Sequence, residues 1–434
     1  MTGSIIQEKK EIDLWIAKFI QNSKAVLDSV DSQVTTIIQD VKNQGDEAII
    51  KFSRKFDKID INQSTLYFND AEITQAEKKV SKKERKAIEL AFSRIKSYHK
   101  NQLPSDKFWK DKMGVELGFR WSPLSSIGIY VPGGIASYPS SVLMNAVPAK
   151  VAGVKSITMA TPTPLGKVNS LVLFAAKMAG VDKIIRVGGA QAIAALAYGT
   201  KNISPVDKIV GPGNAYVAAA KRQVFGQVGI DAVTGPSEVL IIADKKNNPK
   251  WIAADLLAQS EHDKNSRAIL ITTCFRLATQ VQFSVKEYLN NLAHPQVAKT
   301  SWERNGKIIV VKKLEAAIEI ANLVAAEHLQ ICTSEPEVLA EKIHNAGAIF
   351  LGEMTPEVFG DYILGSNHVL PTNRTARFSS SLSVLDFMKR TSISKMSKVA
   401  LRPLGEAAEL LAKAETLEAH GLSARLRIEA DNDQ

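Results

Sequence analysis

Cysteine is scarce in this sequence of 434 residues. The two cysteines, Cys274 and Cys332, each lie in an apolar stretch typical of a buried strand, and neither has a partner at the spacing of a metal site. We therefore expect neither a disulfide framework nor a zinc site built from thiolates.

Long apolar runs are absent as well. No segment approaches the roughly 18 consecutive apolar residues that a membrane helix needs. The first residues include Glu8, Lys9, Lys10 and Glu11 and lack the apolar core of a signal peptide. The sequence therefore predicts a cytoplasmic protein that does not bind a membrane.

Clusters of charge are also few, although the net charge is +10 from 55 basic and 45 acidic residues. The charges are scattered along the chain, and the densest short run covers residues 78–86. Such a run is typical of a solvated helix face, with nucleic-acid binding as the weaker alternative. We therefore expect no nucleic-acid partner.

Apolar β-branched runs alternate with helical stretches from about residue 127 onward, and this alternation indicates parallel sheets of the α/β class. A chain of this length is expected to form two or more domains. The runs fall into two series, at residues 127–130, 156–159, 183–187 and 208–210, and at residues 238–244, 268–271, 307–311 and 348–351. Charged amphipathic helix precedes them, and a Ser/Arg-rich loop and an Ala/Glu/Leu-rich helix follow.

Glycine-rich loops follow three strands of the first series, at residues 131–134, 187–191 and 210–214. Glycines at the carboxyl ends of parallel strands let the backbone approach a ligand. None of the loops matches Gly-x-Gly-x-x-Gly, because Tyr216 stands at the third glycine position after Gly211. Nucleotide binding and plain tight turns both remain open. Tyr130, Gln191 and Asn214 could each bind a ribose or an amide, or serve only their own turn.

Gln259 and His262 lie three residues apart at the end of a predicted helix and share one face. This spacing suits a metal, although it is common by chance. Glu327 and His328 are adjacent and close an apolar helix at a strand entrance. They could serve as acid and base at a strand edge, or His328 could simply interact with the helix dipole at a carboxyl terminus.

Two further segments concentrate polar groups. A long loop holds Asp361, Asn367 and His368, and the tail holds Glu415 and His420. The last two are five residues apart, so either the helix breaks between them or they face different neighbours. Four of the seven histidines fall in these four segments. The concentration favours one shared metal-and-base site, for which carboxylate, imidazole and amide ligands suit zinc.

Five longer segments resemble the histidinol dehydrogenase family, and the resemblance runs from about residue 120 to residue 427. They are residues 129–134 with 138–146, 188–199, 211–214, 235–238 and 326–329. The resemblance implies zinc- and NAD-dependent oxidation of L-histidinol through L-histidinal to L-histidine, the last step of histidine biosynthesis. The first ~120 residues match weakly and contain no implied site residue.

The same resemblance implies a role for each site residue. The implied zinc ligands are Gln259, His262, Asp361 and His420, which would also contact the substrate. Tyr130, Gln191 and Asn214 would contact NAD. Further substrate contacts would come from Ser237, His328, His368 and Glu415, and Glu327 and His328 would act as acid and base.

The fold implied by the resemblance is α/β, with two incomplete Rossmann-like parallel-sheet domains, one inserted in the other. We expect a helical N-terminal arm at residues 1–27 and a first α/β domain, with the metal and catalytic residues, at residues 28–129 and 238–381. The inserted NAD-binding domain would cover residues 130–237. The tail at residues 382–434 would complete the site of the partner in a homodimer.

Two other classes of function compete with a dehydrogenase. In a zinc hydrolase, Glu327 would activate a metal-bound water, but this leaves the glycine loops unexplained. A two-domain binding protein would use the polar cluster only for recognition. Within the dehydrogenase hypothesis, neither cysteine lies in a motif loop, so a hydrated aldehyde is favoured over a thiohemiacetal as the second intermediate.

Overall fold

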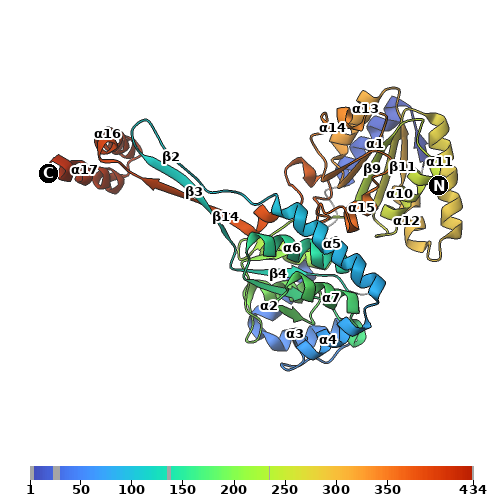
Figure 1. Ribbon diagram of the computed structural model, residues 1–434, viewed down its shortest axis with the longest axis horizontal. Helices are drawn as coiled ribbons and strands as arrows, with labels where there is room; N and C mark the ends of the chain where they lie inside the picture. The colour runs from blue at the N-terminus through green and yellow to red at the C-terminus, as the bar shows by residue number, and fades with distance from the viewer. Residues whose placement is uncertain (1–3, 23–29, 134–137, 234, 433–434) are drawn as a thin grey trace. The chain divides into compact units, whose positions relative to one another are not determined.

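A computed structural model describes residues 4–22, 30–133, 138–233 and 235–432 of the chain (Figure 1). These residues form two compact units. The first unit holds the residues up to 102 and residues 124–387, and the second holds residues 103–123 and the chain from residue 388 onward. The expected boundary between residues 27 and 28 and Gly134 of the first glycine loop lie outside the described residues.

A five-stranded parallel sheet forms from the first series of apolar runs. Its strands are β4 (Ser126–Tyr130), β5 (Ser156–Ala160), β6 (Lys183–Ile185), β7 (Lys208–Val210) and β8 (Gly229–Ile230), in the order β6-β5-β4-β7-β8. The chain thus moves outward from β4 first in one direction and then in the other. In such sheets ligands bind at the carboxyl edge, between the two strands where the direction reverses, here β4 and β7.

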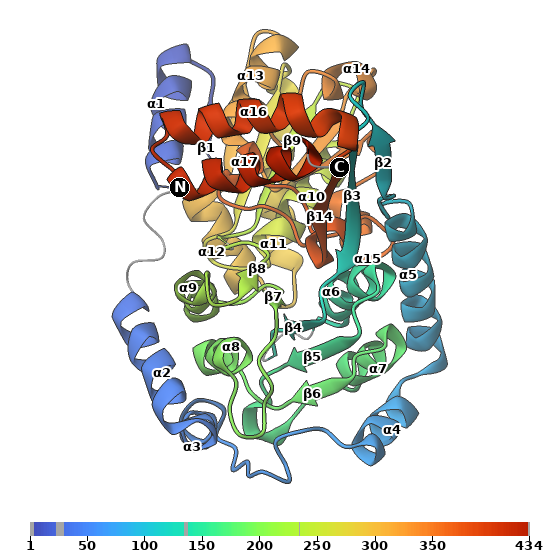
Figure 2. The same cartoon turned by 90° about the vertical axis from the view of Figure 1, so that its left-hand side faces the viewer.

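Helices cover both faces of this sheet. Figure 2 shows α6 (Pro139–Ala152) and α7 (Ser170–Ala179) on one side of the strands, and α8 (Gly189–Tyr198) and α9 (Ala215–Val224) on the other. Residues 190–197 of α8 are all buried. A helix that is apolar all round must be covered on its outer side as well, and further helices of the chain do this.

A six-stranded parallel sheet forms from the second series of runs. Its strands are β1 (Ser4–Ile6), β9 (Glu238–Ala243), β10 (Arg267–Thr272), β11 (Lys307–Val310), β12 (His328–Cys332) and β13 (Ala348–Leu351), in the order β1-β11-β10-β9-β12-β13. Every residue of β9 is buried, as expected for a central strand covered on both faces. The five-stranded sheet is inserted in sequence between β1 and β9. The prediction of two incomplete Rossmann-like sheets, one inserted in the other, is therefore confirmed.

Two hydrophobic clusters hold helices against the six-stranded sheet. On one face lie α10 (Pro249–Ser260), α11 (Phe275–Asn291) and α12 (Gln296–Asn305). On the other lie α1 (Lys9–Asn22), α13 (Leu314–Val324) and α14 (Pro336–Ala340). The short helix α15 (Glu357–Tyr362) contacts α10 and β12. Shorter turns complete the unit, namely the π-helix at Ser53–Asp57 and the 3₁₀ turns at Pro164–Gly166, Thr375–Arg377 and Val384–Phe387.

The packing of the N-terminal region differs from the expected grouping of residues 28–129 with residues 238–381. Instead, α2 (Asp31–Gln44) and α3 (Asp46–Phe52) contact α8, while α4 (Asp70–Lys79) contacts α7 and α5 (Lys82–Lys100) contacts α6. The buried outer sides of the five-stranded sheet's helices provide the apolar surface that these amphipathic helices need. The expected N-terminal arm differs too, because β1 is an edge strand and α1 contacts α13.

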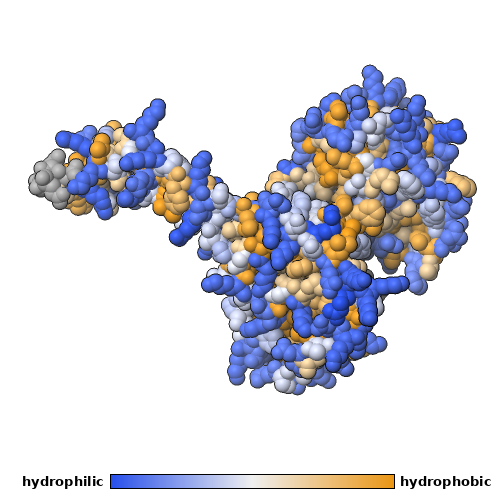
Figure 3. Space-filling model, viewed as in Figure 1, coloured by the Kyte–Doolittle hydropathy of each residue, from blue (hydrophilic) through white to orange (hydrophobic). Residues whose placement is uncertain are grey.

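The second unit is small and contains an antiparallel sheet and two helices. The strands are β2 (Lys107–Lys110), β3 (Glu116–Pro123) and β14 (Met388–Lys395), and the helices are α16 (Lys398–Ala414) and α17 (Glu418–Asn432). Hydrophobic and hydrophilic residues are interspersed on the face of these helices seen in Figure 3. Several large apolar side chains are exposed there, namely Val399, Leu410, Leu411, Leu417, Leu422 and Leu426. Within the described residues no helix is long and apolar enough to span a membrane.

The packing of α3 on α8 predicts a large difference between two apolar residues of the N-terminal region. Ile49 is 1% exposed in the core of the five-stranded sheet, whereas Leu90 on α5 is 53% exposed. Ile49→Ala should lower the free energy of unfolding by about 2–5 kcal/mol, because it opens a cavity. Leu90→Ala should leave it nearly unchanged. Urea unfolding followed by circular dichroism measures both, and equal transition midpoints for the two variants would contradict this packing.

Candidate active site

Glu327 and His328 lie at the amino-terminal edge of the six-stranded sheet. Helix α13 ends at Val324, and His328 is the first residue of β12. The sequence left open whether the pair closes a helix or begins a strand, and the structure selects the strand. Parallel pairing of β12 with β9 places His328 beside Val239, so Glu238 at the start of β9 lies next to the pair. Both Glu327 and His328 are buried.

The imidazole of His328 has one nitrogen bound and one free. Its Nδ1 lies 3.1 Å from the carbonyl oxygen of Glu238. A carbonyl can only accept, so we assign the proton to Nδ1. Nε2 is buried, has no hydrogen-bond partner among the described residues, and lies 3.6 Å from Oδ1 of Asp361. Nε2, the ring nitrogen that can gain or release a proton while Nδ1 stays bound to the Glu238 carbonyl, is therefore the one that faces Asp361.

Three carboxyl groups surround this ring. Glu327 Oε2 and Glu357 Oε2 each lie 3.7 Å from Nδ1, on the opposite side from Asp361. Burial alone would lower the pKa of His328, but the three carboxylates outweigh burial and raise this pKa to about 10. Burial raises the pKa of Glu327 to about 7 and that of Glu357 well above its usual range. The pKa of each group in this cluster therefore depends on the charge of its neighbours.

Main-chain and arginine contacts fix this cluster. The Glu238 N–H donates to Glu327 Oε2 at 2.9 Å. The Glu238 side chain is fully buried and pairs with Arg267 at 2.6 Å, at the start of the neighbouring strand β10. Ser237, an implied substrate contact, precedes β9, and its carbonyl accepts from the Arg267 N–H at 2.9 Å.

Glu357, Glu238 and Arg267 were not among the predicted site residues. Glu357 follows Pro356 in the first turn of α15. Acidic residues there are common for reasons of helix stability alone, so the sequence contained no signal for its burial. Glu238 closes the segment 235–238 that carried part of the family resemblance, and this was the available signal for it.

Three of the four implied zinc ligands lie in the first unit. Gln259 is in the last turn of α10, and both polar atoms of its amide are buried, with no hydrogen-bond partner in the part of the chain that the structure describes. His262 follows the helix end and is exposed, and Asp361 lies in α15. A buried amide with no partner is costly, so Gln259 fits a ligand that the chain itself does not supply.

Among the described residues, no group of three or more His, Cys, Asp or Glu could hold a metal ion. The implied set includes only two residues of these types from the first unit, His262 and Asp361. Gln259 contributes an amide, and His420 belongs to the second unit.

His368 lies against the same helix as Asp361. Its Nδ1 lies 3.0 Å from the carbonyl oxygen of Asp361, and its Nε2 lies 3.4 Å from Oγ of Ser141 on α6. Burial lowers the pKa of His368. The neighbouring Asn367 has a structural role, since its amide donates to the Met144 carbonyl at 2.7 Å and accepts from the Val369 N–H at 2.8 Å.

Glu415 and His420 lie in the second unit, and a break separates them. Glu415 ends α16, Thr416 has a positive φ of 60°, and α17 begins at Glu418. The helix therefore breaks between the two residues, which was one of the alternatives from the sequence. Both residues are exposed.

The three implied NAD contacts lie at the carboxyl edge of the five-stranded sheet. Tyr130 ends β4, and its hydroxyl accepts from the Gly189 N–H at 3.0 Å. Gln191 in the first turn of α8 is buried, and its Oε1 has no hydrogen-bond partner among the residues that the structure describes. Asn214 is the N-cap of α9 and accepts from Tyr216 N–H at 3.1 Å and Val217 N–H at 3.2 Å. Asn214 therefore serves its own turn through its oxygen and keeps its amide N–H groups for a ligand.

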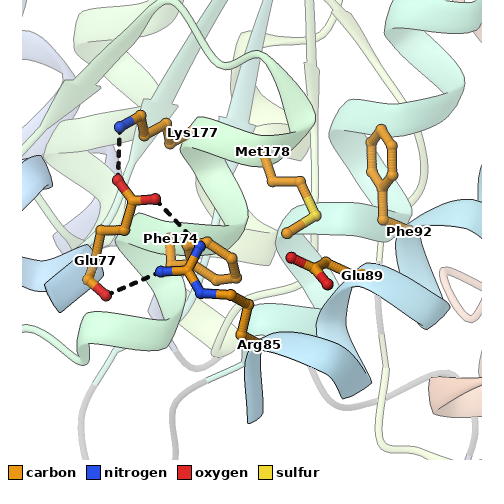
Figure 4. A pocket seen from close by; sticks show the side chains of 7 residues that line it. All are labelled: Glu77, Arg85, Glu89, Phe92, Phe174, Lys177 and Met178. Atoms are coloured by element: carbon orange, nitrogen blue, oxygen red, sulfur yellow. Dashed lines mark hydrogen bonds and ion pairs between the residues drawn. The ribbon is translucent and has the colours of Figure 1, made fainter. Parts of the chain in front are cut away.

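A pocket of about 470 Å³ lies elsewhere, between α4, α5 and α7 (Figure 4). Its Glu77 is paired with both Arg85, at 3.2 Å, and Lys177, at 2.7 Å, and this lowers the pKa of the Glu77 carboxyl. None of the predicted site residues lines this pocket. The charged side chains of this pocket are paired with one another, so their arrangement does not require a bound ligand.

Glycine loops lie at the edge of one parallel sheet and a buried acid–base cluster lies at the edge of another, as in an α/β enzyme, and the similarity of the chain to named dehydrogenases makes its class an α/β dehydrogenase. More particularly, the chain belongs to the histidinol dehydrogenase family, whose model matches residues 20–428. The match includes most of the N-terminal region, where the sequence suggested only weak similarity.

Named relatives and a solved structure agree with this membership. The histidinol dehydrogenase of Ruegeria pomeroyi is 55% identical over 403 residues, which are 93% of each chain. That of Brucella abortus is 53% identical over 428 residues, covering 99% of this chain and 100% of the relative. A crystal structure of histidinol dehydrogenase from Elizabethkingia anophelis has a TM-score of 0.93 at 37% identity, covering 100% of this chain and 99% of the other.

The pairing of Arg267 with Glu238 predicts a large effect on stability. Arg267→Met should lower the free energy of unfolding by about 3–5 kcal/mol, because it leaves a buried carboxylate without its cation. Arg54→Met is the control, since the Arg54–Asp60 pair is 68% and 78% exposed and should contribute little. Denaturant unfolding compares the two variants. A loss for Arg267→Met no larger than that for Arg54→Met would show that this pair does not stabilise the sheet edge.

Proposed function

We propose that this chain is a zinc- and NAD-dependent enzyme that oxidises L-histidinol through L-histidinal to L-histidine, the last step of histidine biosynthesis, in the cytoplasm. Membership in the histidinol dehydrogenase family supports the activity. The assignment of roles rests on the surroundings of the His328 ring. Its Nδ1 is hydrogen-bonded to the Glu238 carbonyl, its Nε2 has no hydrogen-bond partner among the described residues, and three carboxyl groups lie around it.

His328 acts as the general base. In the neutral form of the ring, Nε2 takes the proton of the substrate hydroxyl as the first hydride leaves the carbon, and takes a proton of the hydrated aldehyde in the second oxidation. The bond from Nδ1 to the Glu238 carbonyl keeps the ring oriented between these steps. The nearby carboxylates of Glu327, Asp361 and Glu357 stabilise the imidazolium that forms after each transfer.

Glu327 activates the water that hydrates the aldehyde. Burial raises the pKa of its carboxyl to about 7, and a general base is most effective when its pKa lies near the working pH. The Glu238 N–H fixes one of its oxygens at 2.9 Å, which leaves the other to bind water. Glu327 thus serves the step between the two oxidations.

The residues of the first unit fit a zinc ion. Gln259 offers a buried amide without a partner, and the carboxylates around His328 favour a nearby cation. Gln259, His262 and Asp361, with His420 of a second copy, would hold the ion. When bound, zinc would orient the imidazole and amino nitrogens of the substrate. With Ser237, His368 and Glu415, the same four residues form the substrate site.

The carboxyl edge of the five-stranded sheet fits NAD, which accepts a hydride in each oxidation when bound. Gln191 offers a buried carbonyl oxygen without a partner, and Asn214 offers free amide N–H groups. Burial raises the pKa of Tyr130 to about 12, so its hydroxyl stays protonated as a donor. These three residues would contact the cofactor.

The environment of Cys332 supports hydration of the aldehyde, rather than a thiol adduct, as the route from aldehyde to acid. Burial raises the pKa of Cys332 to about 12, and its sulfur accepts from Gln330 Nε2 at 3.2 Å. A reactive cysteine needs an exposed, stabilised thiolate. Cys332 has neither property, so we assign it a packing role.

The second unit completes the site of another copy in a homodimer. Glu415 and His420 are exposed, as are several leucines on the same two helices. Contact with a second copy would cover these apolar side chains and bring both polar groups to a zinc site that holds only three ligands from its own chain.

The division of roles predicts different losses in the two half-reactions. Glu327→Gln should reduce oxidation of supplied L-histidinal more than oxidation of L-histidinol to the aldehyde, because only the former needs activated water. His328→Ala should reduce both by about 10²- to 10⁴-fold. Production of NADH followed by absorbance with each substrate measures this. His294→Ala, at an exposed histidine, is the control and should retain full activity. Equal losses of Glu327→Gln in the two half-reactions would contradict its role.

The zinc assignment predicts that His262→Ala and His420→Ala each lose bound metal while they remain folded. Each substitution removes one of four ligands. Atomic absorption of the purified dimers measures the zinc content, and circular dichroism checks the fold. Full zinc occupancy in either variant would be incompatible with the proposed ligand set.

A shared site predicts that these two inactive variants rescue each other. In a mixed dimer of His262→Ala and His420→Ala chains, one site keeps both histidines and the other loses both. Joint refolding should therefore restore part of the activity. If verified heterodimers stay as inactive as the separate variants, each chain completes its own site.

A further inference from the structure

A buried ion pair holds the glycine loop between β7 and α9. The Gly211 N–H donates to Asp231 Oδ2 at 2.8 Å, and the Gly211 carbonyl accepts from Lys221 Nζ at 3.0 Å. Lys221 and Asp231 also form an ion pair with each other. Asp231 thus accepts from the N–H of Gly211, and Lys221 donates to its carbonyl.

This pair is unusually deep for charged side chains. The side chain of Lys221 is 1% exposed and that of Asp231 is 3% exposed. Taking two charges out of water is costly, and an apolar pair of similar size often gives equal or greater stability. Stability alone is therefore a weak reason for this pair. What an apolar pair cannot provide is the donor and the acceptor that meet Gly211.

Gly211 lies where a small change in the loop would alter the implied cofactor contacts. Its φ is +113°, and a side chain there would overlap the carbonyl oxygen of Tyr130. Tyr130 in turn accepts from the Gly189 N–H at the start of α8. Asn214, the N-cap of α9, follows three residues later. The loop therefore contacts the end of β4 at Tyr130 and leads to Asn214 at the start of α9, while Tyr130 contacts the start of α8.

The pair also joins three elements around this loop. Lys221 is in the second turn of α9, Asp231 directly follows the edge strand β8, and Gly211 directly follows β7. A shift of α9 or β8 would therefore move the loop through these hydrogen bonds.

We infer that Lys221 and Asp231 are positioning residues for dinucleotide binding, which hold Gly211 so that Tyr130 and Asn214 meet the cofactor. This inference rests on the proposed NAD site. It assigns the pair an effect on cofactor affinity, while zinc and substrate binding at the six-stranded sheet should not depend on it.

Two double variants of the full-length enzyme test the inference. Lys221→Met with Asp231→Leu removes the charges and both bonds to Gly211. Lys221→Gln with Asp231→Asn removes the charges but keeps a donor and an acceptor. Lys51→Met with Asp40→Leu is the control, because in that ion pair of 3.3 Å the side chain of Lys51 is 59% exposed and that of Asp40 is 26% exposed. Isothermal titration calorimetry with NAD, zinc content and urea unfolding are measured for each protein.

The Met/Leu pair should weaken NAD binding by about 10- to 100-fold, the range for residues that orient direct ligand contacts. Its zinc content should stay near that of the wild type, while its free energy of unfolding should fall by a moderate amount, because the N–H and the carbonyl of Gly211 each lose a partner. The Gln/Asn pair and the control should bind NAD nearly as well as the wild type. In steady state the Met/Leu pair should raise KM for NAD with little change in KM for L-histidinol.

Wild-type affinity for NAD in a folded Met/Leu protein would overturn the inference and leave the pair a purely structural role. If only the Gln/Asn protein folds, a large loss of NAD affinity at wild-type stability would overturn it as well, because the bonds to Gly211 are kept there. Failure of the wild type itself to bind NAD would overturn the proposed function, and this outcome is separate because the wild type is measured first.

Discussion

The parallel pairing of β9 with β12 is the constraint on which the candidate active site depends. In this register the main chain of Glu238 reaches both members of the acid–base pair, donating to Glu327 and accepting from His328. A shift by one residue would turn every side chain of the strand to the opposite face of the sheet. The orientation of the base and of the water-activating acid thus follows from strand pairing in the core.

Burial at this sheet edge makes the charge of each group depend on its neighbours. The carboxylates of Glu327, Asp361 and Glu357 raise the pKa of His328, and burial raises the pKa of Glu327 and Glu357. A cation bound at Asp361 would offset one of these charges and favour the neutral imidazole that a base requires. The unpartnered amide of Gln259 points to the same requirement for a ligand.

Strands β9 to β13 have the same spatial order as strands β4 to β8, with β1 added at one side of the six-stranded sheet. The candidate site residues, however, lie at opposite edges of the two sheets. In the five-stranded sheet, the glycine loops lie at the carboxyl edge, where such sheets usually bind ligands. In the six-stranded sheet, the site residues lie at the amino edge. At the carboxyl edge of β9, Asp244 is engaged by the N–H and the hydroxyl of Ser334, at 3.0 and 3.1 Å. Contacts from the loop after β12 therefore satisfy the residue that would otherwise be a candidate ligand there.

Local pattern in the sequence was sufficient to predict most strands of both sheets, because a strand buried on both faces requires a continuous apolar run. The two predicted series did not include β1, β8 and β12. Local pattern also predicted the glycine loops, and the motifs carried the family resemblance. The position of α2 and α3 was not predictable, because an amphipathic face shows that a helix packs but not against which partner. The second unit's use of residues 103–123 was missed for a similar reason, since strand pairing joins segments far apart in sequence.

By itself the sequence determined the fold class, the family and the identity of His328 and Glu327 as a candidate pair. Only the tertiary structure decided that His328 begins a strand, which of its nitrogens is free, and that Glu357 and Glu238 join the cluster. It also showed that Lys221 and Asp231 hold the Gly211 loop. The physical reason is that burial and hydrogen-bond partnership are properties of contacts between distant segments, and one-dimensional spacing does not encode those contacts.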